Sequence, residues 1–162
     1  MIKKVLKLIL IVLAAGLIVI QFFQVSKVNP PTVEAETIYS AVAVPSDVRA
    51  VLERSCADCH SHSTKYPWYA NIQPSGWFLK DHIDEGRQKI NFSTFATYTL
   101  KKQAHKLEEV CEQIEKKEMP LPSFLWIHGE AALSEAEGKL LCDWSKAEKA
   151  KLDERIAALP PA

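Results

Sequence analysis

Apolar and polar positions divide the chain into an apolar amino-terminal stretch and a longer amphipathic part. Leu8 to Ile20 is an unbroken apolar run, and Lys3, Lys4 and Lys7 precede it. With its flanking apolar residues the stretch reaches about 20 residues, which is enough for one helix across a bilayer. The lysines favour a cytoplasmic amino terminus, so the rest of the chain would be exported.

Residues 1–25 are therefore expected to form a signal anchor and single transmembrane helix. No small-x-small cleavage motif follows the apolar run closely, so a cleaved signal peptide is the less favoured alternative. Residues 26–45 contain Asn29-Pro30-Pro31 and end at Pro45. Because proline resists helix formation, this stretch is expected to be an extended linker.

The remainder, residues 46–162, repeats apolar residues every three or four positions, which predicts amphipathic helices. The expected helices begin at Ser46 or Asp47 and end near His60, run from Ser75 to Gln88, run from Thr99 to Glu118, and begin at Ser134 and end near Leu159. Ser134 and Glu137 have the spacing of a capping box. The fold class expected from this pattern is all-α.

Composition and charge narrow the class of partner. The chain has 162 residues, 20 basic and 20 acidic, and a formal net charge of zero. This length suits one modest domain. No basic footprint indicates binding to nucleic acid.

The most specific motif is Cys56-Ala57-Asp58-Cys59-His60. It matches Cys-x-x-Cys-His, the attachment signature of c-type haem, and it occurs once. Each thiol can add to one porphyrin vinyl group, and the adjacent histidine can reach the iron from the same side. The sequence therefore predicts one covalent haem c held by Cys56 and Cys59, with His60 as an axial iron ligand.

Two other kinds of site share the Cys-x-x-Cys pattern. A structural zinc site needs a second ligand pair at suitable spacing, and His62 is too close to Cys59 for the usual zinc-finger geometry. A redox dithiol would be expected at the start of a helix in a strand–helix unit. No parallel-sheet pattern surrounds the motif, so covalent haem is the preferred interpretation.

Several segments beyond this motif resemble the haem-binding domain family of bacterial c-type cytochromes. The matching segments are Ser55–Ser61, Tyr66–Tyr69 (YPWY), Gly76–Trp77, His82–Arg87, Asn91–Ser93 (NFS), Glu118–Leu121 and Leu133–Ser134. They cover nearly all of the expected soluble domain, in the family's order. The resemblance implies one covalent haem and a cytochrome c-like helical domain, and it implies little about physiological role.

Met119 is the preferred candidate for the second axial ligand. It precedes Pro120 at a helix end and is similar to the Met-Pro segment that supplies this ligand in class I cytochromes c. Met1 is the other methionine, and it lies at the far amino terminus. An ordinary packing role for Met119 is the alternative. The rival histidines are His62, His82, His105 and His128, of which His82 and His128 remain open.

The expected function is that of a membrane-anchored c-type cytochrome that transfers single electrons among unidentified redox proteins. The haem domain would lie on the periplasmic side of the cell membrane. A gas sensor or a peroxidase-like enzyme with a displaceable sixth ligand is the alternative. No catalytic set beyond the haem is visible, so an electron carrier is preferred over an enzyme.

Three further features leave alternatives open. Cys111 and Cys142 lie on apolar helix faces. They would form a disulfide in an oxidising compartment or remain as two buried thiols. The aromatic loop over residues 61–74 is interpreted as one wall of the haem crevice, with a small core patch as the alternative. Arg87 would pair with a haem propionate or lie in solvent.

Overall fold

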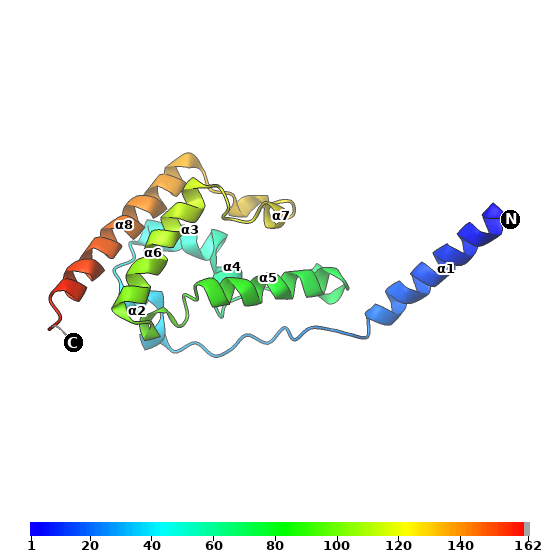
Figure 1. The fold of residues 1–162 in the computed structure, drawn as a ribbon, viewed down its shortest axis with the longest axis horizontal. Helices are drawn as coiled ribbons and strands as arrows, with labels where there is room; N and C mark the ends of the chain where they lie inside the picture. Colours follow the sequence, from blue (N-terminus) through cyan, green and yellow to red (C-terminus); the bar gives the residue numbers. More distant parts are fainter. Residues whose placement is uncertain (161–162) are drawn as a thin grey trace.

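The computed structural model describes residues 1–160, which form helices and no strand (Figure 1). The α-helices are α1 (Ile2–Ile20), α2 (Ile38–Ala41), α3 (Ser46–Ser55), α4 (Ala57–His60), α5 (Ser75–Lys89), α6 (Leu100–Glu115), α7 (Pro122–Leu125) and α8 (Glu135–Ala157). The 3₁₀ helices are η1 (Glu34–Glu36), η2 (Trp68–Asn71), η3 (Phe95–Thr97) and η4 (Gly129–Ala131). The all-α fold class is confirmed.

Helices α6 and α8 form an antiparallel pair along one side of the molecule (Figure 1). A disulfide joins Cys111 of α6 to Cys142 of α8, with 4.6 Å between their Cα atoms. The structure thus has the disulfide rather than two free thiols. Thr99 caps α6 by accepting a hydrogen bond from the Lys102 N–H.

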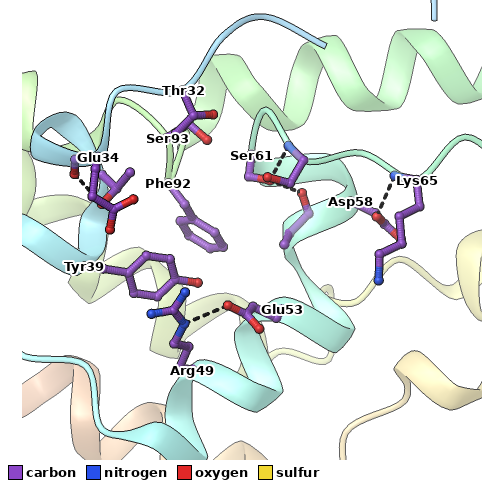
Figure 2. Close-up of a pocket in the computed structure, with 13 residues that line it drawn as sticks. Thr32, Glu34, Tyr39, Arg49, Glu53, Asp58, Ser61, Lys65, Phe92 and Ser93 are labelled. Atoms are coloured by element: carbon purple, nitrogen blue, oxygen red, sulfur yellow. Dashed lines mark hydrogen bonds and ion pairs between the residues drawn. The ribbon is translucent and has the colours of Figure 1, made fainter. Parts of the chain in front are cut away.

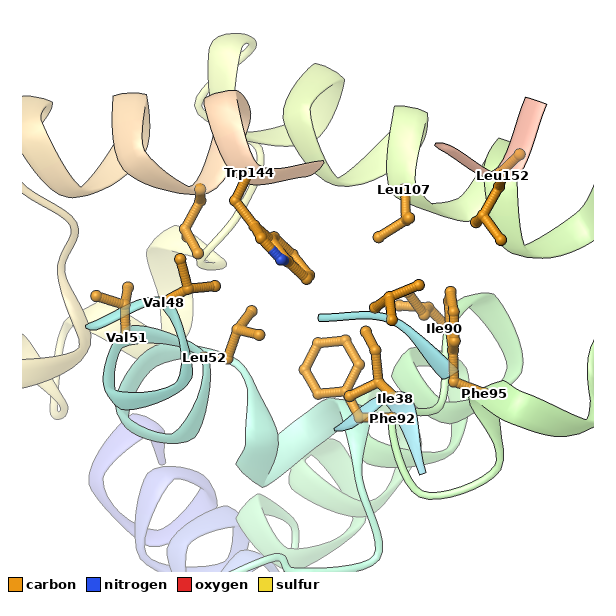
Figure 3. Close-up of a cluster of buried hydrophobic side chains, with 13 residues drawn as sticks. Ile38, Val48, Val51, Leu52, Ile90, Phe92, Phe95, Leu107, Trp144 and Leu152 are labelled. Atoms are coloured by element: carbon orange, nitrogen blue, oxygen red, sulfur yellow. The ribbon is translucent and has the colours of Figure 1, made fainter. Parts of the chain in front are cut away.

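The main core lies between this helix pair and α3 (Figure 3). Its largest buried side chains include Leu52, Leu107, Leu141 and Phe95. The helical spacing that predicted α6 and α8 also places their apolar residues on the faces that meet this core. A smaller cluster lies under α5 and consists of Ala70, Leu79 and Ile83.

The stretch expected to be a linker is extended only in its first part. Residues 34–41 form η1 and α2, and Ile38 and Val42 belong to the core. The Ile38 N–H donates to the Phe92 carbonyl at 2.7 Å, which fixes α2 against the chain after α5. This short helix depends on contacts with residues distant in sequence, and the local sequence has no apolar periodicity that would predict it.

Helix α1 contributes no buried side chain to the domain. Within residues 1–160, no helix combines the length and the apolar character that crossing a membrane requires. The expected transmembrane helix is therefore not found. Lys3, Lys4 and Lys7 occupy the first two turns of α1, so its apolar part is shorter than the ~20 residues of a typical span.

Two helix starts were predicted from capping residues. Ser134 and Glu137 form the expected capping box at the start of α8. The start of α3 differs, because Pro45 is its N-cap residue and makes no side-chain cap bond, although the Asp47 carboxylate accepts a hydrogen bond from the Val48 N–H at 2.9 Å. Helix α3 also stops at Ser55, and the Cys-x-x-Cys-His motif continues in the separate turn α4.

Candidate functional site

The Cys-x-x-Cys-His motif forms one tight turn between α3 and α5. Cys56 has φ −128° and ψ −36°, which breaks the helix after Ser55. The Cys56 carbonyl then accepts hydrogen bonds from the Cys59 N–H at 3.2 Å and the His60 N–H at 3.0 Å. This turn brings both cysteines and the histidine to one place, as attachment of one haem would require.

Helix α5 packs closely against the motif because Gly86 has no side chain. A Cβ atom at this position would lie 2.9 Å from the Cys59 carbonyl oxygen and 3.3 Å from the Cys59 Cβ. Side chains rarely approach a backbone that closely without displacing it. Gly86 therefore sets how near α5 comes to the cysteines.

The same contact orients His60. Its Nδ1 lies 2.9 Å from the Gly86 carbonyl oxygen and 3.1 Å from the Ile90 carbonyl oxygen, so Nδ1 carries the proton. Burial lowers the pKa of His60, and the two backbone hydrogen bonds oppose that shift. The ring is thus neutral, and the Nε2 lone pair is left for a metal ion, a common arrangement for metal-ligating histidines.

A cavity of about 470 Å³ opens beside the motif. The motif residues that line it are Cys56, Cys59 and His60, and Met119 lines it from the segment after α6. This volume falls within the range of small-molecule and cofactor sites. The structure therefore brings all four predicted haem-site residues to one cavity.

The remaining lining of the cavity matches a porphyrin in character. Its apolar part is Leu52, Val110, Ile114, Leu121, Phe124 and Leu141, with Ile90 and Phe92 beside His60. Lys89 and Lys106 also line it, together with acidic residues that include Glu109, to which Lys106 is ion-paired. Lys89 would offer a cation for a carboxylate such as a haem propionate. The Ser55 hydroxyl is buried at the cavity wall and has no hydrogen-bond partner among the described residues. A bound group with an acceptor would satisfy it.

The thiols of the motif have the electrostatics of protonated cysteines. Burial raises the pKa of Cys56 to about 12, and burial with the nearby Asp58 carboxylate raises the pKa of Cys59 to about 11. Redox dithiols need the opposite shift, because the thiolate is their reactive form. The surroundings of this pair therefore do not suit a thioredoxin-like site.

Most rival histidines are bound elsewhere. The Nδ1 of His62 contacts the Pro31 carbonyl and its Nε2 contacts Asn91. His128 lies between the Tyr69 hydroxyl, 2.8 Å from its Nε2, and Glu130. Neither lines the cavity.

The other two rivals differ from each other. His105 is exposed on α6 beside Glu108 and Glu109 and does not line the cavity. His82 does line it, with its Nδ1 2.8 Å from the Phe78 carbonyl oxygen. His82 is thus the one rival histidine that shares the cavity with Met119.

The structure favours the core-patch alternative for the aromatic loop and gives Arg87 contacts that neither expectation included. Tyr66 and Tyr69 pack with Cys59 in the small cluster under α5 and do not line the cavity. The Arg87 side chain does not line the cavity, and it is not simply solvated either. Its guanidinium donates to the Ser61 carbonyl at 2.8 Å and to the Thr64 hydroxyl at 3.0 Å, so it holds the loop after the motif.

A second cavity of about 270 Å³ is lined by residues of α3 and α4 (Figure 2). Several of the polar groups in its lining already have partners. The Arg49 guanidinium bonds Glu53 at 2.7 Å and lies 4.3 Å from the centre of the Tyr39 ring. Its lining contains neither the motif thiols nor His60.

Sequence reasoning missed how Asn91–Ser93 supports the motif. The Phe92 N–H donates to the His60 carbonyl at 2.7 Å, and the Ser93 hydroxyl accepts from the His62 N–H at 2.9 Å. The Asn91 side chain accepts from the Ser93 N–H at 2.9 Å and shapes this turn. The NFS segment was noticed in the sequence, but its hydrogen bonds to the motif can be identified only in the folded structure.

Comparison with known proteins agrees with this site. The model of the haem-binding domain family matches residues 15–147, which include the motif, α5, α6 and Met119. No curated protein and no solved structure matches the chain significantly. The match covers most of the chain, so this protein belongs to the haem-binding domain family.

Proposed function

We propose that the protein is a c-type cytochrome that holds one covalent haem in the cavity beside α4. The observation that carries the proposal is the shared lining of this cavity by Cys56, Cys59, His60 and Met119. The two cysteines would hold the porphyrin through thioether bonds. His60, with its free Nε2, and Met119 would be the axial ligands of the iron.

Bound haem supplies an iron atom that accepts and releases single electrons. With His60 and Met119 as ligands, the iron would have no open position for a substrate, so the role that fits is electron transfer with redox proteins still to be identified. The apolar walls of the cavity would exclude water from the bound haem. The carbonyls of Gly86 and Ile90 keep the His60 ring in one orientation.

The proposed location is the periplasmic side of the cell membrane, with attachment through residues 1–25. Thioether-bound haem belongs outside the cytoplasm, and the Cys111–Cys142 disulfide is typical of an oxidising compartment. The basic and apolar character of α1 supports export. Fractionation of cells that express the full chain tests this, with recovery in the cytosol as the contrary result.

Replacement of both motif cysteines tests covalent attachment. We expect the Cys56→Ala, Cys59→Ala variant to lose haem that survives denaturing electrophoresis, because no other thiol lines the cavity. The matched control is Cys111→Ala, Cys142→Ala, which also removes two cysteines but leaves the motif intact. Haem staining that persists in the first variant would contradict the proposal.

Replacement of Met119 tests the second ligand. Loss of the thioether should lower the reduction potential and open the iron to carbon monoxide, because His/Met ligation raises the potential. We expect this for Met119→Ala and not for His82→Ala, although both residues line the cavity. Absorption spectra with and without carbon monoxide measure the difference.

A haem-based sensor is the second candidate, favoured by the presence of His82 beside Met119 in the cavity. A sensor would bind carbon monoxide in the wild-type protein. An electron carrier with both ligands in place would not.

A further inference from the structure

Four large apolar side chains form an exposed patch where η2 meets α5. Trp68 is 72% exposed, Ile72 48%, Trp77 38% and Phe78 58%. We call these four residues the aromatic patch. They are close in space, since η2 contacts α5 and three residues join the two helices. Clustered exposed apolar side chains of this kind mark interaction sites.

The chain that follows α1 is fastened to the same place. Gln21 exchanges two hydrogen bonds with the Gln73 backbone, at 2.9 and 2.8 Å. The Gln24 side chain donates to the Asn71 carbonyl at 3.2 Å. The Trp77 indole N–H donates to the Phe23 carbonyl at 2.8 Å. The carboxyl end of α1 is therefore held against the aromatic patch (Figure 1).

Helix α1 indicates what covers this surface. Its residues are apolar around the whole circumference after Lys7, and none is buried by the described part of the chain. A groove on a protein would cover one face of such a helix, whereas lipid covers all of them. Phe22 and Phe23, 82% and 63% exposed, continue the apolar surface from α1 to the aromatic patch.

We propose that the aromatic patch rests on the surface of a phospholipid bilayer, beside the attached helix α1. This rests on the proposed membrane attachment and extends it to the haem domain itself. Tryptophan suits the headgroup region because its ring is apolar and its N–H is polar. The Trp77 N–H is already satisfied by Phe23, so the ring can meet lipid without losing a hydrogen bond.

The patch also continues to the edge of the haem cavity. The Phe78 ring lies 4.2 Å from the His82 ring, measured between centroids, and His82 lines the cavity. Lipid contact at Phe78 would keep this edge of the cavity near the membrane surface. Redox partners embedded in or bound to the membrane would then be favoured over freely diffusing ones.

Hydroxyl-radical footprinting of the full-length holoprotein in vesicles tests the proposal. The vesicles contain phosphatidylcholine and phosphatidylglycerol, and oxidation is read at each residue by mass spectrometry. The reference is a full-length variant, free in buffer, with Leu10→Ser, Leu13→Ser and Leu17→Ser, since these side chains are exposed and support no packing. The internal control is Leu159, which is 57% exposed and follows α8 at the other end of the chain.

We expect oxidation of Trp68 and Phe78 in vesicles to fall at least about threefold below the reference, with oxidation of Leu159 nearly unchanged. The proposal would be overturned if oxidation of Trp68 and Phe78 did not fall, or if oxidation of Leu159 fell by the same factor. Protection in the buffer reference that disappears on dilution would show a second copy on the patch instead of lipid.

Flotation and haem content are measured on the same samples. A chain that does not float with the vesicles refutes membrane attachment and the patch contact together. A floating chain with an unprotected patch refutes only the patch contact. A chain that floats with a protected patch but carries no covalent haem would count against the cytochrome assignment and not against the patch contact.

Discussion

At the scale of single residues, the site depends on a glycine, Gly86, which has no side chain to keep α5 away from the motif. Gly86 lets α5 approach Cys59, and its carbonyl holds the Nδ1 proton of His60. Ile90 adds the second carbonyl, one turn later. Main-chain groups of α5 and of Ile90, its C-cap residue, thus contribute to both the position and the orientation of the motif.

Gly86→Ala should disturb both the close approach of α5 to Cys59 and the orientation of His60. Alanine gains about 1 kcal/mol of helix propensity, but its Cβ would meet a backbone carbonyl that cannot rotate away. We expect a net loss of about 1–2 kcal/mol in the free energy of unfolding and a lower yield of covalent haem. Urea denaturation and haem staining measure these effects.

Gly129→Ala is the matched control, because no atom lies within 4 Å of its added Cβ. It should leave stability and haem yield close to wild type. If Gly86→Ala behaves in the same way, the close approach of α5 is not needed for haem attachment.

The candidate site could be predicted from sequence where its signal is local. Cys56, Cys59 and His60 are adjacent and form a specific motif, and Met119 stands in a recognisable Met-Pro pair. The partners of His60 are distant main-chain carbonyls, which have no sequence signature. The fate of Arg87 also depends on the loop over 61–64, so its side chain was assigned wrongly.

At the scale of elements, helices with a long apolar period were predictable and short ones were not. The expected helix over 75–88 is α5, and the capping box correctly starts α8. Helix α2 forms because Ile38 is buried and bonds Phe92, a contact between segments far apart in sequence. The separation of α3 from α4 arises from the backbone of Cys56, which periodicity does not report.

The start of α8 carries a pH-sensitive contact. The Glu137 carboxylate bonds the Arg54 guanidinium at 2.7 Å and the Ser134 N–H at 2.8 Å. These contacts lower the pKa of Glu137 from 4.5 to about 2, with the hydrogen bond to Arg54 as the largest cause. Because the folded-state pKa is the lower one, the stabilisation is complete above pH 4.5 and is lost as the pH falls toward 2.

Glu137→Gln should therefore lower stability at neutral pH and flatten its decline between pH 4.5 and 2. Thermal melting across this pH range measures the slope. Glu135→Gln, in the same first turn of α8, is the control and should retain the wild-type slope. An unchanged slope in the Glu137 variant would show that other carboxyl groups dominate acid unfolding.

At the scale of the whole molecule, the haem cavity lies between two parts of the chain. The motif and α5 form one wall, and α6 with the segment through Met119 forms the other. The second wall is held by the pairing of α6 with α8, which the Cys111–Cys142 disulfide crosslinks. The position of Met119 relative to His60 is thus linked to the stability of this helix pair.

The disulfide should contribute measurably to that stability. It joins residues 31 positions apart, and closing a loop of this length removes unfolded-state entropy equivalent to about 3–4 kcal/mol. We expect a thiol reductant to lower the free energy of unfolding by up to this amount in urea denaturation.

Samples with and without the thiol reductant should both contain ascorbate, so that the iron is ferrous in each and only the disulfide differs. The Cys111→Ala, Cys142→Ala variant should be less stable than wild type and insensitive to the thiol reductant. A wild-type midpoint that does not move on verified reduction would mean that helix packing alone holds the second wall of the cavity.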